Sequence, residues 1–238
     1  MIEAIKVAKT FGLRPVLRGV DMTVAPGEFV ALFGPNGAGK TTFLRIVASL
    51  SKPTAGLIRI AGYQLPTEAA TVRGLLGVVS HAPLIYGDLS AAENLHFYAR
   101  MYGLDRAARE DRITAVLEMV GLGRRAGDLA RTFSRGMQQR LAIARAILHD
   151  PPVLLLDEPY TGLDQDAAAV LDRVLREVAV RGRTVLMTTH DITRGLALAD
   201  RALILSGGKI AYDAPTAGLE PVAFARSYAE VTGMATVR

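Results

Sequence analysis

The sequence of 238 residues contains no cysteine. This absence excludes a disulfide-stabilised scaffold, a thiolate nucleophile, and zinc or iron–sulfur sites with cysteine ligands. The sequence also lacks the roughly eighteen uninterrupted apolar residues of a membrane-spanning helix, and its first residues, Met1 to Lys6, lack the basic flank and apolar block of a secretory signal. Half of the residues are hydrophobic and 21% are charged, which excludes intrinsic disorder. These features predict a soluble, cytoplasmic globular protein.

Basic residues modestly outnumber acidic residues. The 28 basic and 23 acidic residues give a net charge of +5 and alternate along the chain without a block of lysine or arginine. One interpretation is an ordinary solvated surface; others are contact with a polyanionic ligand, a nucleic acid or an anionic membrane surface. Aromatic residues are only 6% of the chain and are scattered, so they do not predict a stacking platform for bases.

The order of strand and helix patterns indicates an α/β fold. Apolar runs bounded by turn residues predict strands at 16–24, 28–33, 57–60, 76–79, 153–156, 184–189 and 202–205. Helical periodicity predicts helices at 42–49, 91–101, 106–120 and 138–148. A later apolar stripe (Val170, Leu171, Val174, Leu175, Val178) predicts a helix whose charged residues face away (Asp172, Arg173, Arg176, Glu177). A helical insert between about 87 and 151 thus interrupts a strand-rich core.

The segment Gly34–Thr41 matches the phosphate-binding loop and stands between a predicted buried strand and a predicted helix. Its glycines allow successive N–H groups and the helix N-terminus to point at phosphates. Lys40 is predicted to neutralise the β- and γ-phosphates, and Thr41 to offer its hydroxyl to Mg²⁺. The other predicted nucleotide-binding residues of this segment are Gly34, Pro35, Asn36, Gly37, Ala38, Gly39 and Thr42. A chance glycine-rich turn is the alternative, and the surrounding pattern disfavours it.

Two acidic residues, Asp157 and Glu158, follow the apolar strand at 153–156, at the end where ligands bind in open α/β sheets. Asp157 is predicted to hold Mg²⁺. Glu158 is predicted to orient or deprotonate the attacking water, because hydrolysis of a γ-phosphate depends mostly on positioning. An acidic pair that merely caps a strand is the alternative, but the preceding phosphate-binding loop favours the chemical role.

A third motif, Phe133 to Arg140, separates this chain from small-molecule kinases that share the first two motifs. It resembles the signature of the ATP-binding-cassette (ABC) family, which is close to Leu-Ser-Gly-Gly-Gln. The chain keeps Ser134, Gly136 and Gln138 of that pattern and departs from it at Arg135 and Met137. Taken alone, the segment is a helix N-cap. A P-loop kinase would leave this motif, Thr161–Asp164 and His190 unexplained.

The resemblance extends from Ile2 to about Tyr212 and implies the roles of further residues. It implies that Ser134, Gly136 and Gln138 bind ATP, that Phe11 stacks on adenine, and that His190 contacts the γ-phosphate during catalysis. Thr161–Asp164 resembles the dimer-contact loop of the family. His96 and His149 are interpreted as surface or helix-end residues. His149 is predicted to lie near a helix C-terminus, which favours positive charge.

The implied fold is a P-loop NTPase with a RecA-like core, an N-terminal antiparallel β subdomain and an inserted α-helical subdomain. We therefore expect one ABC ATPase domain over 1–238. Residues 1–86 and 151–212 would form the β subdomain and the core, 87–150 the helical subdomain, and 213–238 a C-terminal tail.

His81 marks a departure from the family pattern. Alignment of Leu76–Pro83 with the usual segment places His81 where a glutamine normally contacts Mg²⁺ and the attacking water. His81 is therefore predicted to be catalytic and metal-binding; the alternative is a histidine that ends a strand and points to solvent. A histidine here, together with Asp88–Leu95, resembles the haem-exporter, cytochrome c maturation branch of the family and its multidrug-exporter relatives.

The resemblance implies the ATP-hydrolysing subunit of a membrane transporter that uses ATP and Mg²⁺. It implies a head-to-tail dimer, with homodimer and heterodimer both open, on the inner face of the cell membrane. A membrane subunit on a separate chain is expected to dock at Pro83–Tyr86, an apolar patch that could equally be core. The alternative function is a soluble ABC-type ATPase acting on nucleic acid, ribosomes or cofactor assembly. No nucleic-acid partner is expected, because the paired cassettes or long coiled coil usual in ribosome-acting or nucleic-acid-acting members do not occur here.

Overall fold

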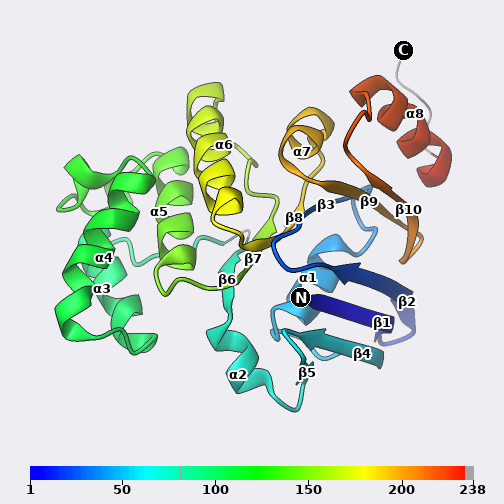
Figure 1. Cartoon of the computed structure of the whole chain (residues 1–238), viewed down its shortest axis with the longest axis horizontal. Coiled ribbons are helices and arrows are strands. Elements are labelled where there is room, and N and C mark those ends of the chain that lie inside the picture. The colour runs from blue at the N-terminus through cyan, green and yellow to red at the C-terminus, as the bar shows by residue number, and fades with distance from the viewer. Residues whose placement is uncertain (81, 234–238) are drawn as a thin grey trace.

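The computed structural model describes residues 1–80 and 82–233, which form two β-sheets and the helices around them (Figure 1). The first sheet is antiparallel, in the order β2-β1-β4-β5, and consists of β1 (Ile2–Phe11), β2 (Arg14–Val24), β4 (Ala55–Ile60) and β5 (Tyr63–Leu65). The second has the order β10-β9-β3-β8-β7-β6 and consists of β3 (Phe29–Phe33), β6 (Leu76–Val79), β7 (Val153–Asp157), β8 (Thr184–Thr188), β9 (Arg201–Ser206) and β10 (Lys209–Pro215). Its strands are parallel except β10, which pairs antiparallel with β9. The α/β fold class and the antiparallel β subdomain are confirmed.

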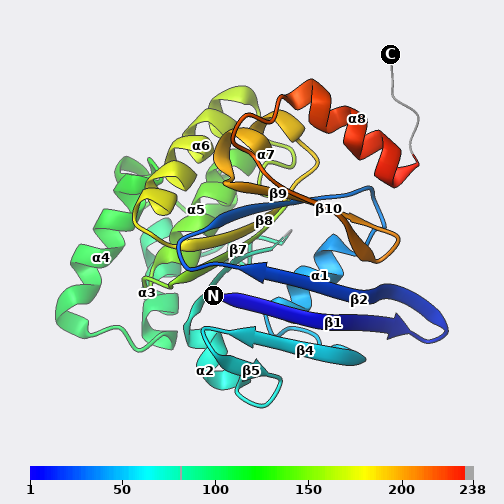
Figure 2. The ribbon, with the colours of Figure 1, turned by 45° about the vertical axis from the view of Figure 1, so that its right-hand side comes forward.

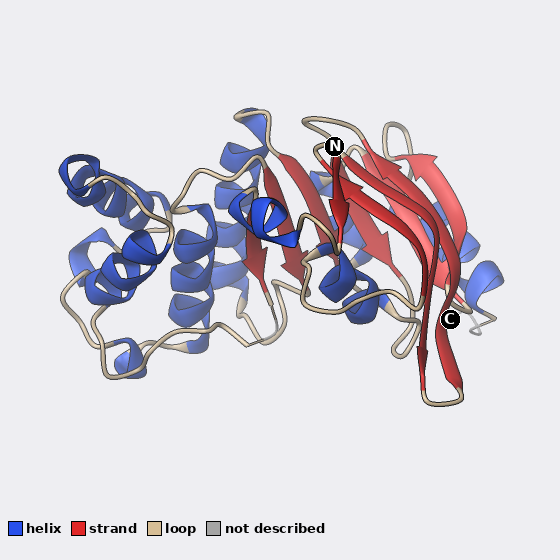
Figure 3. Ribbon diagram, turned by 90° about the horizontal axis from the view of Figure 1, so that it is seen from below, coloured by secondary structure: helices blue, strands red, loops and turns tan. Residues whose placement is uncertain are grey.

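The helices lie on both sides of the second sheet and beyond its β6 edge. They are α1 (Lys40–Val47), α2 (Ala69–Gly74), α3 (Ala91–Met101), α4 (Arg106–Met119), α5 (Arg135–Ile147), α6 (Gln165–Val180), α7 (Ile192–Leu198) and α8 (Pro221–Thr232). The insert helices α3, α4 and α5 gather at one end of the molecule, away from the first sheet (Figures 1 and 3). Throughout the described ranges, every helix is too short or too polar to cross a membrane.

Strand β3 lies inside the second sheet and is buried along its whole length. Phe29, Ala31 and Phe33 pack in the core shared with the helices of the insert and α6 to α8. Val30 and Leu32 pack in a second core, which contains α1 and the inner face of the first sheet (Figure 2). A strand covered on both faces needs apolar side chains at every position. The apolar run at 28–33 therefore forms a strand buried on both faces, as predicted.

Two predicted helix boundaries are wrong, and local backbone geometry gives the reason. The helix predicted at 42–49 spans Lys40–Val47, because it begins directly after Gly39 and because Ser49, at φ 59°, has left the helical region. The helix predicted at 138–148 begins at Arg135, since the Ser134 hydroxyl accepts a hydrogen bond from the Met137 N–H and caps the helix there.

Strand β1 and helix α8 are absent from the predicted elements. The alternation of β1 is broken by a register shift between Ala4 and Val7, where Lys6 has a φ of 48°. Helix α8 lies within residues 213–238, which the sequence assigned to a tail. It packs Phe224 against Phe33, with ring centroids 4.8 Å apart, so this segment contributes to the core beside the phosphate-binding loop.

His149 joins the helical insert to the second sheet. It lies just after the end of α5, as the helix-end interpretation predicted, but the positive charge predicted for it there is wrong. Its ring stacks on Tyr102 of α3 with centroids 3.7 Å apart, and its Nε2 donates to the Leu76 carbonyl of β6 at 3.2 Å. Burial lowers the pKa of His149 to about 4, and Arg112 and Arg145 act in the same direction against Asp150. The ring is therefore neutral rather than a cation at a helix C-terminus.

We expect this burial to make the fold sensitive to acid. The unfolded chain protonates His149 near its ordinary pKa of about 6.5, whereas the folded chain does so only near 4, so stability is lost as the pH falls through this interval. His149→Gln keeps a donor for Leu76 and cannot titrate. Its thermal midpoint should fall less than that of the wild type between pH 7 and pH 5. Parallel losses in both proteins would contradict the buried, neutral histidine.

Candidate functional site

The candidate site lies at the carboxyl ends of β3, β8 and β7, three neighbouring parallel strands. The segment Gly34–Thr41 follows β3, His190 follows β8, and Asp157 and Glu158 stand at the end of β7. The carboxyl edge of a parallel sheet is where α/β proteins bind ligands, because loops and helix N-termini converge there. Motifs that are up to about 150 residues apart in the chain thus meet at one edge.

The loop Gly34–Thr41 is shaped to receive an anion. Gly39 precedes α1 at φ 107°, and a side chain there would also collide with Leu17, whose nearest atom lies 2.8 Å from the position of a Cβ. Lys40 begins α1, is only 7% exposed, and donates from Nζ to the Gly34 carbonyl at 2.6 Å. A cavity of about 340 Å³ opens over this loop, lined by Arg14, Val16, Pro35, Asn36, Gly37, Gly39, Lys40, Thr41, Thr42 and Glu158. A buried cation beside a helix N-terminus suits the phosphates of a nucleotide.

Asp157 is buried and receives two hydroxyl groups. Thr41 donates to its Oδ1 at 3.1 Å, and Thr188 donates to the same oxygen at 2.7 Å. Thr41 comes from the helix after the phosphate-binding loop, so Asp157 joins that loop to β7 and β8. Hydroxyl and carboxylate oxygens are the hard donors that Mg²⁺ prefers. The residues predicted to hold Mg²⁺ at this point therefore fit that ion.

Glu158 directly follows Asp157 and has a backbone in the left-handed region, at φ 50°. Its N–H donates to both the carbonyl and the hydroxyl oxygen of Thr188, at 3.1 and 3.0 Å. Its carboxylate then faces two cationic or polar groups: Lys40 Nζ at 3.6 Å and His190 Nδ1 at 2.7 Å. The predicted residues Lys40, Glu158 and His190 thus form one cluster, with Thr188 beneath them.

Thr188 is a site residue that sequence reasoning missed. A threonine at the end of a buried strand has no motif of its own, and its role depends on the register of β8 beside β7, where Thr188 pairs with Asp157. Its one hydroxyl donates to the Asp157 carboxylate and accepts from the Glu158 backbone. It therefore fixes the two neighbouring acids in different directions.

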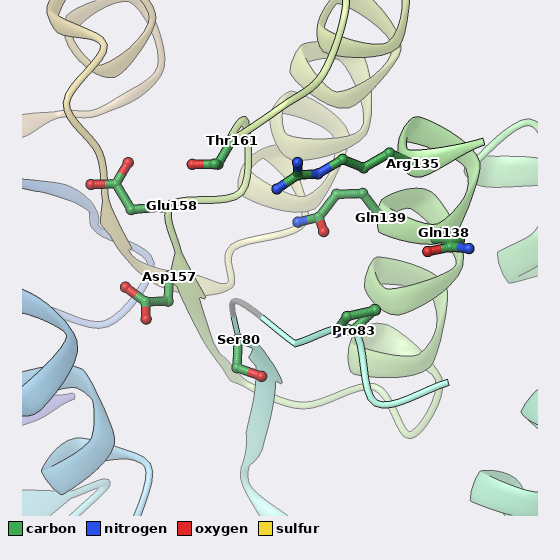
Figure 4. A pocket seen from close by; sticks show the side chains of 8 residues that line it. All are labelled: Ser80, Pro83, Arg135, Gln138, Gln139, Asp157, Glu158 and Thr161. Carbon is green, nitrogen blue, oxygen red and sulfur yellow. The ribbon is translucent and has the colours of Figure 1, made fainter. Parts of the chain in front are cut away.

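The signature residues lie on the first turn of α5, beside α6. Gly136 allows this approach, because a Cβ there would lie 2.7 Å from the side chain of Ala167. Arg135, which departs from the family pattern, packs against Gly162. A Cβ added to Gly162 would lie 2.5 Å from the Arg135 guanidinium. A second cavity, of about 400 Å³, separates this turn from the acids of β7 (Figure 4); its lining is Ser80, Pro83, Arg135, Gln138, Gln139, Asp157, Glu158 and Thr161. In the described residues, no part of α5 lines the cavity over the phosphate-binding loop.

One predicted site residue, Phe11, stands apart from this cluster. Phe11 ends β1, where its half-exposed ring lies 5.0 Å from the Lys9 ammonium. Its cross-strand partner is Arg14, which lines the cavity over the phosphate-binding loop, but Phe11 itself does not line that cavity. His81 lies outside the described residues, and its predicted roles stay predictions.

Comparisons with known proteins agree with this geometry. A family model described as ABC transporter matches residues 17–161. The Nod factor export ATP-binding protein I of Paraburkholderia xenovorans is 40% identical over 217 residues, 91% of this chain and 71% of that protein. A protein of the same name from Rhizobium meliloti is 37% identical and is covered over 64% of its length.

Solved structures of cassettes have the same fold. The ATP-binding cassette MJ0796, a dimer in a post-hydrolysis state bound to ADP and Pi, superposes with a TM-score of 0.83 at 29% identity, over 91% of this chain and 99% of that one. An ATP-binding subunit of an ABC transporter gives a TM-score of 0.84 at 31% identity, over 98% of this chain and 95% of that one. These values place the chain in a P-loop fold with the β subdomain and mixed sheet described above.

Thr188→Val is expected to slow nucleotide hydrolysis while leaving nucleotide binding nearly unchanged, because it removes the hydroxyl between Asp157 and the Glu158 backbone but none of the phosphate-binding loop. The lost hydrogen bonds should also lower the free energy of unfolding by about 1–3 kcal/mol. Thr184→Val is the matched control: Thr184, at the other end of β8, accepts from the Gly27 N–H at 3.0 Å. Equal turnover in the two variants would show that Thr188 serves stability alone.

Proposed function

This chain belongs to the ABC transporter family as an ATP-binding subunit with ATPase activity, and we propose that it powers export through a membrane subunit on a separate chain. The observation that carries the catalytic part of the proposal is the cluster of Lys40, Glu158 and His190 beside the Thr41–Asp157 pair. It brings a cation for phosphate, a carboxylate for water and oxygen donors for a metal to one edge of the sheet.

In the proposed mechanism, the phosphates of ATP bind to the Gly34–Thr41 loop and pair with the Lys40 ammonium. Thr41 and Asp157 would hold Mg²⁺, which when bound supplies positive charge next to the phosphates. The Glu158 carboxylate then accepts a proton from the attacking water. His190, whose Nδ1 is 2.7 Å from Glu158 Oε2, orients that carboxylate and reaches toward the γ-phosphate.

The second part of the proposal is a head-to-tail dimer. Ser134 and Gly136 lie on α5, which lines no part of the cavity over its own phosphate-binding loop within the described ranges. In a dimer, these residues of one subunit would close over ATP held by Lys40 of the other. The loop Thr161–Asp164 would lie at the contact, and Asp164 fixes its end by capping α6 with a hydrogen bond from the Ala167 N–H at 2.8 Å. The cassette dimer with ADP and Pi supports this arrangement.

We expect Glu158→Gln to bind ATP almost normally, to hydrolyse it very slowly and to accumulate as a dimer in ATP. Glutamine keeps the volume of the side chain but cannot take a proton from water. Gel filtration with and without ATP, together with phosphate release, measures both effects. Undiminished turnover would remove Glu158 from the catalytic role.

Two further changes in the Glu158→Gln background identify the surfaces of that dimer. Lys40→Ala should lose nucleotide affinity and therefore the dimer. Ser134→Arg should retain ATP binding in the monomer yet elute as a monomer, because the added side chain blocks closure over the other subunit's nucleotide. A dimer of undiminished stability in Ser134→Arg would argue against closure by the signature turn.

The third part of the proposal concerns the membrane subunit. Leu84, Tyr86, Phe97 and Met101 are exposed and adjoin the helical insert; Met101 is 67% exposed. The loop that carries Leu84 and Tyr86 is firmly attached, because the buried Asn94 side chain accepts from the Tyr86 N–H at 2.8 Å and donates to the Tyr86 carbonyl at 2.9 Å. An exposed apolar patch on rigid backbone suits a protein partner.

This patch also connects to the catalytic edge. Tyr98 donates to the Leu84 carbonyl at 2.6 Å, and the buried Arg145 donates to the Val78 carbonyl at 2.6 Å while its guanidinium lies 5.3 Å from the Tyr98 ring. Arg145 and Tyr98 of the insert therefore bind Val78 and Leu84, which lie before and after Ser80 in the chain. Ser80 lines the cavity at Asp157 and Glu158. We propose that movement of a docked membrane subunit reaches the site by this route.

Leu84→Ser with Tyr86→Ser is expected to reduce both copurification with an integral membrane protein and ATPase activity in native membranes, with isolated ATPase activity unchanged. Apolar area on the docking patch is lost, whereas the nucleotide site is not touched. Val180→Ser is the control, because it likewise replaces an exposed apolar side chain by serine but lies on α6, away from the patch. Unchanged recovery of the membrane protein and unchanged membrane-stimulated activity would exclude the patch as the docking surface.

The substrate is set by the membrane subunit, so we propose only the direction of transport. The relatives reported above are named Nod factor export ATP-binding protein I, which supports export as the direction. They lend no support to the haem-exporter branch suggested by His81. We further propose that His81 contacts the metal and the water, since Ser80 and Pro83 on either side of it line the cavity with Asp157 and Glu158. Docking on a transporter would place the chain on the inner face of the membrane.

A further inference from the structure

Four side chains behind the catalytic cluster form a continuous series of polar contacts. Tyr160, two residues after Glu158, donates from its hydroxyl to Asp172 Oδ1 of α6 at 2.6 Å. The other oxygen of Asp172 lies 3.7 Å from Arg194 Nε of α7. Arg194 in turn donates from Nη1 to Asp191 Oδ2 at 2.8 Å. Asp172 lies outside the apolar stripe of α6, and its carboxylate faces α7.

These contacts close into a ring through the catalytic residues themselves. Asp191 adjoins His190, and His190 Nδ1 lies 2.7 Å from Glu158 Oε2. Across the ring, the Arg194 guanidinium lies 5.5 Å from the centre of the Tyr160 ring, within range of a cation–π contact. The ring therefore joins the ends of β7 and β8 through α6 and α7, independently of their backbone hydrogen bonds.

His190 needs such a constraint because packing does not hold its ring. Its side chain is 69% exposed, in contrast to the buried Thr189 before it. The position of the imidazole is therefore set mainly by its backbone and by Glu158. Asp191 fixes that backbone twice: its Oδ1 accepts from the Arg194 N–H at 3.0 Å and caps α7, and its Oδ2 binds the Arg194 guanidinium.

The two proton donors of the ring, Tyr160 and Arg194, both have a raised pKa. Burial, with the hydrogen bond to Asp172 next, raises the pKa of Tyr160 well above its ordinary value, so the phenol keeps its proton and donates. The hydrogen bond to Asp191 is the main cause that raises the pKa of Arg194. These two groups therefore keep the protons that they donate to Asp172 and Asp191.

We propose that Tyr160, Asp172 and Arg194 are positioning residues that hold His190 and Glu158 at their working separation. The inference rests on the proposed catalytic roles of these two residues and adds the part of the chain that aligns them. It predicts that a break in the ring slows the chemical step without weakening ATP binding, because Tyr160, Asp172 and Arg194 do not line the cavity over the phosphate-binding loop.

The test measures kcat, KM for MgATP, equilibrium ATP binding and thermal unfolding in the full-length chain. Arg194→Gln should lower kcat by about tenfold, in the range typical of residues that support catalytic groups, with KM within about twofold. Arg194→Lys should recover part of kcat. Tyr160→Phe, which keeps the ring packing and the Asp172–Arg194 pair, should lower kcat by about threefold. The double variant should be no slower than Arg194→Gln alone, because both changes open the same ring.

Glu177→Gln is the matched control, since Glu177 lies on the same helix and pairs with Arg181 at 2.9 Å outside the ring; its kcat should equal that of the wild type. Glu158→Gln and His190→Ala are measured in parallel. If these two lose turnover but Arg194→Gln and Tyr160→Phe retain wild-type kcat, the ring has no positioning role and the proposed site stands. If Glu158→Gln and His190→Ala retain wild-type turnover, both the proposed site and the inference are overturned. Should Arg194→Gln fail to fold, Tyr160→Phe decides.

Discussion

Two neighbouring carboxylates at the end of one buried strand are the constraint on which the rest of the site depends. Asp157 and Glu158 would repel each other if both pointed into the same apolar surroundings. The two carboxylates have different partners: Asp157 accepts from Thr41 and Thr188, whereas Glu158, whose backbone is left-handed, faces Lys40 and His190. Under the proposed function, the first carboxylate would hold a metal and the second would accept a proton from water.

The order of the strands supplies these partners. Because β3, β8 and β7 are adjacent and parallel, the residues that follow them emerge at one edge: the phosphate-binding loop, His190 and the acidic pair. The register of β8 against β7 sets Thr188 opposite Asp157, and a shift of one residue would turn its hydroxyl to the other face. The two apolar cores on either side of the sheet fix that register. Packing far from the site therefore determines its hydrogen bonds.

Sequence patterns predicted the parts of the site whose chemistry requires a local motif. The glycine-rich loop with Lys40 and the acidic pair Asp157–Glu158 are both local motifs, so both parts of the candidate site are recognisable without a structure. Strands buried on both faces were likewise predictable from continuous apolar runs. Thr188 was not, because its role exists only through strand register. Nor was Asp172 distinguishable from the other charged residues of α6, since only the place of α7 determines which of them faces Arg194.

The Lys40 ammonium faces the Glu158 carboxylate and, under the proposed function, would also pair with the phosphates of a nucleotide. In this structure it donates to the Gly34 carbonyl and lies 3.6 Å from the Glu158 carboxylate, within a cavity that both residues line. Under the proposed function, phosphates that enter this cavity would bring more negative charge to Lys40 than a single carboxylate does, and would compete with Glu158 for it. The Glu158 carboxylate would then keep its contact with His190. Occupation of the phosphate site and release of the proposed base would therefore be linked through one cation.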